Sequence, residues 1–382
     1  MPIISRRSQI EPFHAMDVLA RANSMMANGK PVISMAVGQP SDPVPEPVRQ
    51  AAQAALANGR LGYTDALGLP ELRNAIAAHY GEHYGISVDP GRIAVTNGSS
   101  AAFNLAFLAM FDVGDRVAIT RPGYPAYRNI MQALGLEVVE IPVDLASGPL
   151  TAARLEEVHK ATKLDGLLFA SPANPTGQML PEAELELLVQ TAENLGITVI
   201  SDEIYHRLNY SGADHTALMT SENAVIINSF SKYYCMTGWR VGWMVLPEKL
   251  VRPIERIAQS LYISPPELSQ RAAIAAFGCA SEYDRVRDRY LANRAILGEA
   301  LPRLGFALAS PMDGAFYAWC DVSAHTQDSM AFAQTMLDKA LVAATPGRDF
   351  DPVNGHRYMR FSYAGTTEHM SEAMHRLEQF LK

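Results

Sequence analysis

The chain has 382 residues, 48% of them hydrophobic, which is enough to bury a large core and to form two domains. Its net charge of -8 at pH 7 argues against nucleic acid as a partner, because binding a phosphate backbone usually needs a basic face. No run of about 18 apolar residues occurs and none follows Arg6 and Arg7, so we expect neither a membrane partner nor a signal peptide.

In chain order, the first forty or so residues show no alternation of strands and helices. After the prolines between 40 and 47, short apolar runs alternate with longer amphipathic runs, which is typical of an α/β protein with a mainly parallel sheet. The expected strands are 93–97, 116–120, 137–141, 166–170, 197–202, 224–229 and 241–246. The expected helices are 101–111, 126–134, 182–195 and 248–259.

The last two of these strands are joined by a short loop. Parallel neighbours need a crossover of about a dozen residues or more, so strand 241–246 should run antiparallel. Beyond Ser281 the helical patterns are 282–301, 329–341 and 368–381, with strand-like runs at 316–320 and 358–362. We therefore expect a large domain over 45–285 with a mainly parallel seven-stranded sheet. Residues 1–44 should pack with 286–382 as a smaller α+β domain.

Polar segments follow the carboxyl ends of five expected strands. They are Gly98-Ser99-Ser100, the run 122–125, the run 171–175, Asp202, and Ser231-Lys232. Each alone could be turn chemistry, since glycine, proline, asparagine, aspartate and serine dominate turns. Ligands of open α/β sheets bind outside the carboxyl ends of the strands, so the five segments should converge on one site.

Lys232 is the most informative residue of these segments. It ends the run Ser229-Phe230-Ser231-Lys232, and Arg240 follows eight residues later. Burial and neighbouring positive charge would keep its amine neutral enough to react with an aldehyde. Two hydroxyls and a guanidinium nearby suit a phosphate. The alternative for this segment alone is a serine-rich turn with a solvated lysine.

The ordered series of motifs resembles the class I aminotransferases that use pyridoxal phosphate (PLP), within the aspartate aminotransferase superfamily of class I and II enzymes. The motifs are Gly38-Gln39-Pro40, Tyr63-Thr64, Asn174-Pro175-Thr176-Gly177, Asp202-Glu203-Ile204-Tyr205, Ser229-Phe230-Ser231-Lys232, Gly238-Trp239-Arg240 and Arg360-Phe361-Ser362. The resemblance implies a fold type I PLP-dependent transferase and a homodimer with shared active sites. It also implies transfer of an amino group between an L-amino acid and a 2-oxo acid through aldimine and pyridoxamine phosphate intermediates.

The resemblance also implies roles around the cofactor ring. Lys232 would bond the cofactor aldehyde and later move the substrate's α-proton. Asp202 would keep the pyridine nitrogen protonated, so that the ring accepts electrons. Asn174 and Tyr205 match the pair that bonds the ring hydroxyl, and Tyr124 matches the aromatic residue stacked on the ring. Taken singly, each of the last three would more simply be a turn or core residue.

The phosphate and the substrate have their own expected partners. By the same resemblance, the phosphate contacts are Ser99, Ser100, Ala101, Ser229, Ser231 and Arg240, with Tyr63 supplied by the partner subunit. Backbone N–H groups at a helix start contribute to such a site. Arg360 would grip the substrate α-carboxylate by two hydrogen bonds, with Gly38 and Asn174 beside it. The family also implies a cis Asn174–Pro175 bond.

One departure from the family concerns the substrate. Aspartate-specific bacterial relatives often carry a lysine in the phosphate turn, where this chain reads Gly98-Ser99-Ser100-Ala101-Ala102. We therefore expect neutral or hydrophobic substrates to be preferred over aspartate. Arg21, Arg60, Arg271 and Arg348 remain candidates for a second carboxylate contact.

Two other classes of function share parts of this pattern. A PLP-dependent lyase, decarboxylase or synthase would keep every cofactor contact, because the fold and the cofactor do not set the reaction. An aminotransferase-like domain of a transcription regulator would follow a DNA-binding domain, but here the resemblance starts within the first forty residues. Cys235, Cys279 and Cys320 lack paired spacing, which favours a reducing, cytoplasmic location and argues against a metal site.

Overall fold

The largest sheet contains every strand expected between residues 93 and 246. The computed structural model describes residues 4–382, so the first three residues of the predicted small domain lie outside the described residues. The sheet has the order β2-β8-β7-β6-β5-β3-β4. Its strands are β2 (Ile93–Thr96), β3 (Arg116–Arg121), β4 (Glu137–Pro142), β5 (Gly166–Ala170), β6 (Thr198–Asp202), β7 (Val225–Ser229) and β8 (Gly242–Val245). The prediction of a seven-stranded sheet is confirmed.

The direction of the strands also agrees with the prediction. β8 runs antiparallel to both β2 and β7, and the other paired strands are parallel. Because β2 and β7 are each antiparallel to β8, they point the same way as the rest. The carboxyl ends of six strands therefore meet at one edge of the sheet.

Helices cover both faces of this sheet, which is why its strands are apolar without alternation. Leu167 and Leu168, neighbours in β5, belong to two different cores. One face is covered by α4 (Ser99–Met110), α5 (Pro125–Leu134) and α8 (Glu248–Leu261). The other face is covered by α3 (Pro70–Tyr84), α6 (Ala152–Ala161) and α7 (Glu182–Asn194).

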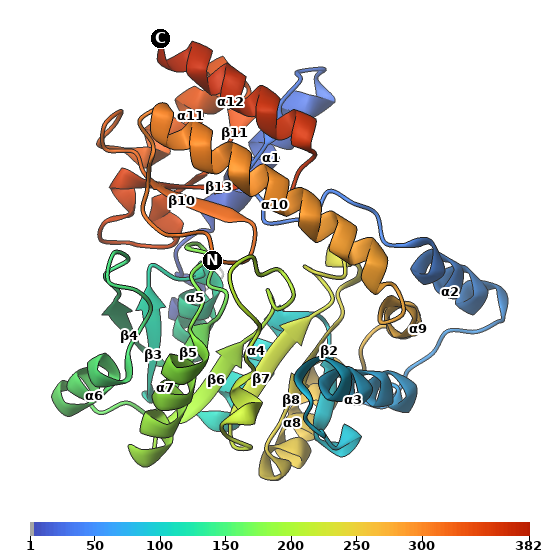
Figure 1. Cartoon of the computed structure of the whole chain (residues 1–382). Helices are drawn as coiled ribbons and strands as arrows, with labels where there is room; N and C mark the ends of the chain where they lie inside the picture. Colours follow the sequence, from blue (N-terminus) through green and yellow to red (C-terminus); the bar gives the residue numbers. More distant parts are fainter. Residues whose placement is uncertain (1–3) are drawn as a thin grey trace.

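Within residues 4–382, five α-helices have no counterpart among the predicted elements. They are α1 (His14–Ala27), α2 (Glu46–Ala57), α3, α6 and α9 (Glu267–Ala276). α2 packs against α9, and Figure 1 shows this pair projecting to one side of the molecule. The many alanines of both helices let them approach closely but form a weak apolar pattern in the sequence.

The N-terminal segment packs with the C-terminal part of the chain. β1 (Ile33–Ser34) pairs in parallel with β11 (Val342–Ala343). Helix α1 (His14–Ala27) contributes Ala22 to a core shared with Leu337 of α11 (Ser329–Ala340). Figure 1 shows the blue α1 beside the orange and red C-terminal elements.

A four-stranded antiparallel sheet completes this part of the molecule. Its order is β12 (Thr345–Pro346), β13 (Tyr358–Ser362), β10 (Tyr317–Asp321) and β9 (Ala307–Leu308), and α10 (Ala280–Arg303) and α12 (Thr367–Leu381) accompany it. The expected boundary at residue 285 falls inside the continuous α10, and the division into two domains stays a prediction. Within residues 4–382, no helix is long and apolar enough to cross a membrane.

Candidate active site

The predicted polar segments converge on one cavity at the carboxyl edge of the large sheet. Its volume is about 190 Å³. Among its lining residues are Gly38, Ser99, Ser100, Tyr124, Asn174, Asp202, Tyr205, Ser231, Lys232, Arg240 and Arg360. Each of the five segments expected to meet here contributes at least one residue. The convergence follows from the common direction of six strands.

Three predicted site residues do not line this cavity. Tyr63 is 81% exposed and lies outside it. Ala101 is buried in the first turn of α4, where only its backbone N–H suits the expected role. Ser229 is buried, and its hydroxyl bonds to Ser231 Oγ at 2.9 Å and to the Val241 carbonyl at 3.1 Å. Ser229 therefore holds the turn before Lys232, and a direct cofactor contact from it stays a prediction.

Lys232 lies in an environment that favours a neutral amine. Its Nζ donates to the Gly38 carbonyl at 2.6 Å. Burial, with the positive charges of Arg360 and Arg240, lowers the pKa of Lys232 to about 8. Gly38 must be glycine, because a Cβ there would fall 1.6 Å from the Tyr317 hydroxyl.

Asp202 is the last residue of β6 and is 3% exposed. Burial raises the pKa of its carboxyl to about 6, although hydrogen bonds from the Tyr127 hydroxyl and the Ile204 N–H oppose the shift. About nine-tenths of such a group is ionised at pH 7. The site therefore contains a buried carboxylate that would gain from a cationic hydrogen-bond donor.

The opposite end of the cavity is suited to an anion. The first N–H groups of any α-helix lack intrahelical partners, and Gly98 provides no side chain to cap those of α4, which begins at Ser99. The hydroxyls of Ser99, Ser100 and Ser231 and the guanidinium of Arg240 surround this helix start. A Cβ on Gly98 would fall 2.4 Å from Arg240 Nη2, so glycine allows the guanidinium to come this close.

Arg360 is a fixed, buried guanidinium on the remaining wall. It is 3% exposed, donates from Nη1 to Asn174 Oδ1 at 2.8 Å and from Nη2 to the Ala36 carbonyl at 2.6 Å. Its Nε has no hydrogen-bond partner within residues 4–382. The rings of Tyr317 and Phe350 lie 4.2 and 4.7 Å from its Cζ. The Asn174–Pro175 bond is cis, as predicted.

Several lining residues were absent from the predicted site. Tyr127 donates to Asp202, and its position three residues after Tyr124 on α5 is the sequence signal that could have found it. Tyr317 shares a 2.6 Å hydrogen bond with the Tyr205 hydroxyl. The others are apolar residues, namely Phe13, Ala15, Met16, Val37, Phe103 and Ile204. Four of these come from the N-terminal segment and reach the site only through tertiary packing.

The four arginines considered for a second carboxylate contact do not line the cavity. Arg21 pairs with Asp338 at 2.7 Å, and Arg271 pairs with Glu267 at 2.5 Å. Arg60 and Arg348 also lie outside the lining. Within residues 4–382, the lysine and arginine side chains that line the cavity are Lys232, Arg240 and Arg360.

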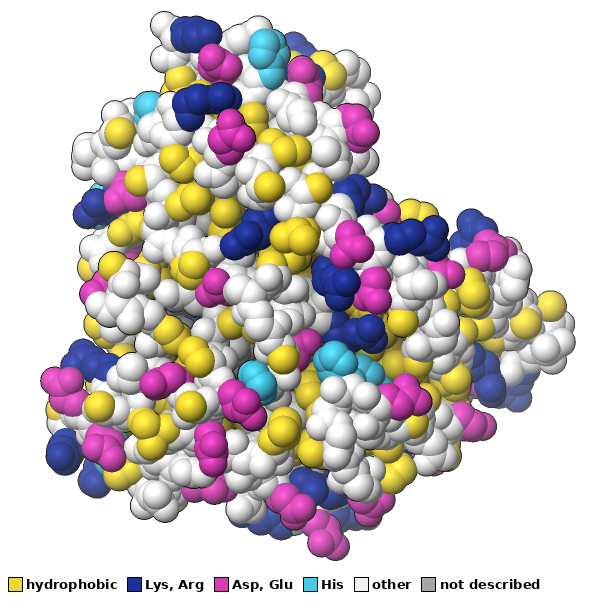
Figure 2. All heavy atoms as spheres, in the orientation of Figure 1, with side chains coloured by type: hydrophobic (Ala, Val, Ile, Leu, Met, Phe, Trp, Pro, Cys, Tyr) yellow, Lys and Arg dark blue, Asp and Glu magenta, His cyan; other side chains and the backbone are white. Residues whose placement is uncertain are grey.

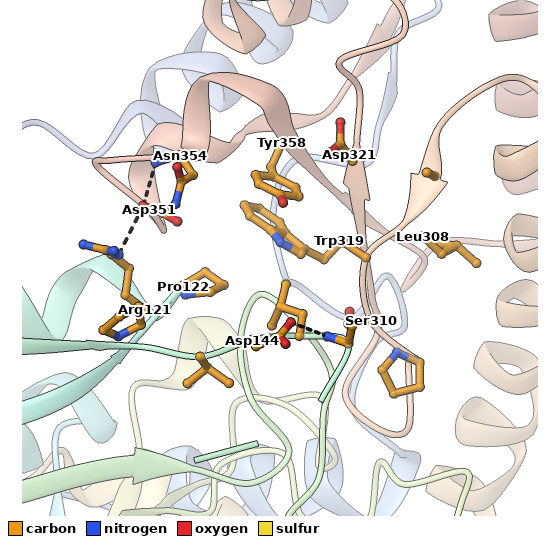
Figure 3. A pocket seen from close by; sticks show the side chains of 17 residues that line it. Arg121, Pro122, Asp144, Leu308, Ser310, Trp319, Asp321, Asp351, Asn354 and Tyr358 are labelled. Carbon is orange, nitrogen blue, oxygen red and sulfur yellow. Dashed lines mark hydrogen bonds and ion pairs between the residues drawn. The ribbon is translucent and has the colours of Figure 1, made fainter. Parts of the chain in front are cut away.

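A larger hollow of about 730 Å³ lies elsewhere, between the ends of β3 and β4 and the four-stranded sheet. Figure 3 shows Trp319 beneath Tyr358 on one wall, with ring centroids 5.2 Å apart, and Arg121 directed toward Asp351 on another. None of the predicted site residues lines it. It therefore contributes no group to the chemistry at Lys232.

Comparisons with known proteins agree with this geometry. Residues 30–377 match the model of the family described as aminotransferase class I and II. A valine–pyruvate aminotransferase of Mycobacterium tuberculosis is 46% identical over 99% of this chain and 98% of that protein. A crystal structure of a putative aminotransferase from Silicibacter pomeroyi is 47% identical, with a TM-score of 0.92, covering 100% of this chain and 99% of that one. The aspartate aminotransferase of Thermus thermophilus with maleate is 32% identical, with a TM-score of 0.91, covering 99% and 100%.

Proposed function

The chain belongs to the class I and II aminotransferase family, and from this premise we propose that it binds PLP at Lys232 and transfers amino groups from neutral L-amino acids to a 2-oxo acid. It is an aminotransferase, so the alternative reactions at the same kind of site are set aside. The observation that carries the proposed site is the convergence of Lys232, Asp202 and Arg360 on one cavity.

The residues present fit the cofactor. Members of this family depend on PLP. The N-terminus of α4, with Ser99, Ser100, Ser231 and Arg240, offers the donors that a phosphate requires. Asp202 offers a carboxylate for a protonated ring nitrogen. When bound, PLP draws electrons from the substrate α-carbon, which makes the α-proton removable.

Lys232 and Asp202 would then perform the proton chemistry. With a pKa of about 8, about a tenth of the Lys232 amine is neutral at pH 7 before the cofactor binds. The Nζ atom would bond the cofactor aldehyde and, once displaced by the substrate amine, remove the proton from the substrate α-carbon. The Asp202 carboxylate would hold a proton on the ring nitrogen by charge and hydrogen bonding.

Arg360 would orient the substrate by its α-carboxylate. Its planar guanidinium can hold two carboxylate oxygens, and its contacts to Asn174 and Ala36 keep the plane fixed. The rest of the substrate would meet Phe13, Met16 and Val37, which offer no charge. A distal carboxylate left unpaired there would cost on the order of several kcal/mol. The name of the M. tuberculosis relative, a valine–pyruvate aminotransferase, supports neutral substrates, whereas the Thermus relative is named for aspartate.

Substrate preference is therefore the first test of this function. With a neutral acceptor such as 2-oxobutyrate, we expect kcat/KM to be at least about tenfold higher for valine, leucine, methionine or alanine than for aspartate. Pyruvate cannot serve as the acceptor for alanine, because that pair would give no net reaction. Arg360→Lys should raise KM for all of these amino acids, because a single ammonium cannot reproduce the two-bonded geometry. Steady-state assays of purified enzyme with each donor would measure both effects. A clear preference for aspartate or glutamate would contradict the neutral pocket.

We also propose a homodimer whose sites are shared. The backbone on both sides of Tyr63 is held in place, because the Gly62 N–H donates to Glu267 at 2.7 Å and the Thr64 N–H donates to Ser264 at 3.3 Å. Tyr63 is nevertheless 81% exposed. A fixed segment that presents an aromatic side chain outward supports a role in another subunit.

Mixing two variants tests whether the sites are shared. Lys232→Ala and Tyr63→Phe chains should each have little activity alone, and a mixture should regain it. With free exchange of equal amounts, about a quarter of the sites would combine an intact Lys232 with an intact Tyr63 from the other chain. Activity is measured after dilution and reassociation. No recovery despite proven exchange of subunits would place Tyr63 outside the partner's site.

A cytoplasmic location is proposed on the chemistry of the cysteines. Cys235, Cys279 and Cys320 are all buried and free. Burial raises the pKa of the Cys235 thiol to about 12, so it holds little thiolate at neutral pH. Such cysteines suit a reducing compartment. Basic and acidic side chains are interspersed on the face shown in Figure 2, which gives no support to a nucleic-acid partner.

A further inference from the structure

The N-terminal cap of helix α1 is provided by a residue from the C-terminal part of the chain. Phe13, at the cap position, provides no side-chain hydrogen bond. Instead, Asp349 in the 3-10 helix η5 (Gly347–Asp349) accepts from the His14 N–H at 2.9 Å and from the Ala15 N–H at 2.7 Å. Asp349 is 4% exposed. Its carboxylate occupies the place where a helix start binds an anion, and these two bonds compensate for its burial.

The start of α1, which Asp349 caps, forms part of the wall of the cavity around Lys232. Phe13, Ala15 and Met16 all line it. The Phe13 ring meets the Tyr124 ring edge to face, with centroids 6.0 Å apart. Met16 is 51% exposed, so it lies at the mouth of the cavity. The position of these apolar side chains therefore depends on where α1 begins.

The residue after Asp349 supports two other walls of the same cavity. The Phe350 ring lies 4.7 Å from the Cζ of Arg360, and the Phe350 carbonyl accepts from the Gly123 N–H at 3.0 Å. Gly123 directly precedes Tyr124. One short segment thus positions the turn bearing Phe13 and Met16, the buried guanidinium, and the residue expected to stack on the cofactor ring.

Close backbone packing holds this segment in place. A Cβ on Gly347 would fall 2.6 Å from the carbonyl oxygens of both Gly355 and Tyr358. The Gly355 carbonyl also accepts from the Ser329 hydroxyl at 2.8 Å. Because the backbone packs this closely at Gly347 and Gly355, η5 forms a well-packed base for the cap.

We propose that Asp349 is a positioning residue for substrate selection, which acts by capping α1 so that Phe13 and Met16 form an apolar wall for the substrate side chain. The ligand class selected is an α-amino acid with a hydrophobic side chain of at least three carbons, such as leucine or methionine. For alanine, kcat/KM does not depend on the wall, because its single methyl group is too short to reach Met16 at the mouth of the cavity. The inference rests on the proposed function.

The test compares long and short substrates in Asp349→Ala. Loss of the cap frees α1 to shift, so kcat/KM for leucine and methionine should fall by about tenfold or more, mainly through KM. For alanine the change should stay within about threefold. Met16→Ala should reproduce the effect without touching the cap. Asp349→Asn keeps one acceptor oxygen and should restore most of the leucine activity.

A matched cap elsewhere separates positioning from general destabilisation. Asp328 caps α11 by accepting from the Met330 and Ala331 N–H groups at 3.0 and 3.3 Å, and it is not among the residues that line the cavity. Asp328→Ala should leave the ratio of leucine to alanine activity unchanged. Equal losses on all substrates in Asp349→Ala would overturn the inference.

Three further outcomes decide between this inference and the function on which it rests. If Asp349→Ala does not fold, the exposed Met16→Ala decides, and an unchanged ratio of leucine to alanine activity there overturns the inference. If the wild-type enzyme transaminates no amino acid, the proposed function itself falls. If the wild-type enzyme transaminates leucine but neither Asp349→Ala nor Met16→Ala alters the ratio of leucine to alanine activity, the proposed function stands. Only the role given to Asp349 and to the wall of Phe13 and Met16 is then wrong.

Discussion

Lys232→Ala is expected to lower transamination by about 10³-fold or more, equivalent to about 4 kcal/mol of transition-state stabilisation. The variant would lose both the amine proposed to bond the cofactor and the base proposed to remove the α-proton. Within residues 4–382, no other lysine lines the cavity. The measurement is a single-turnover reaction with valine or leucine, followed by the change in cofactor absorbance.

Borohydride treatment of the wild-type holoenzyme provides the matching chemical test. It should leave the cofactor attached to the peptide that contains Lys232. Lys249 on α8 is an exposed lysine and a suitable control, so Lys249→Ala should keep full activity and the same labelled peptide. A label on any other lysine would remove Lys232 from its proposed role.

The pH dependence of cofactor binding should show the lowered pKa of Lys232. Only the neutral amine attacks an aldehyde, and burial beside Arg360 and Arg240 lowers its pKa to about 8. The rate of reconstitution of apoenzyme should therefore rise about tenfold per pH unit below pH 8 and level off above it. Arg360→Met removes one positive charge, so the plateau should move to higher pH. A rate that keeps rising to pH 10 would match an ordinary solvated lysine instead.

Asp202→Asn is expected to lower kcat by about 10²-fold or more, equivalent to about 3 kcal/mol. Asparagine keeps the shape of the side chain but removes the charge that we propose holds a proton on the ring nitrogen. The wild-type carboxyl, with a pKa of about 6, is mostly ionised at pH 7 even before a cationic partner arrives. Single-turnover kinetics and the absorbance spectrum of the bound cofactor would measure the loss.

The hydrogen bond from Tyr127 allows a graded comparison with Asp202→Asn. Tyr127→Phe removes one donor to Asp202 and leaves the negative charge, so its effect on kcat should be smaller. Cofactor should still bind to both variants, because neither change touches the proposed phosphate contacts at the start of α4. Near-normal turnover in Asp202→Asn would show that the ring nitrogen does not depend on this carboxylate.

The large sheet and the core of the site could be predicted from the sequence because their signals are local. The seven strands are short and mostly apolar, and each predicted bound agrees with the structure to within one residue. A short loop before β8 was enough to predict its direction. The convergence of Ser99, Asn174, Asp202 and Lys232 then followed, since the carboxyl ends of parallel strands share an edge.

The sequence by itself therefore determined the sheet and the meeting of Lys232 with the polar groups that line its cavity. Only the tertiary structure decided that Phe13 and Met16 line the cavity, that Asp349 caps α1, and that the Ser229 hydroxyl bonds to Ser231 and to the Val241 carbonyl. His14 and Asp349 are 335 residues apart along the chain, and a local sequence pattern cannot predict a contact between residues so far apart. The pKa values of Lys232 and Asp202 were likewise decided by folding, because desolvation exists only after the walls of the cavity have closed around these groups.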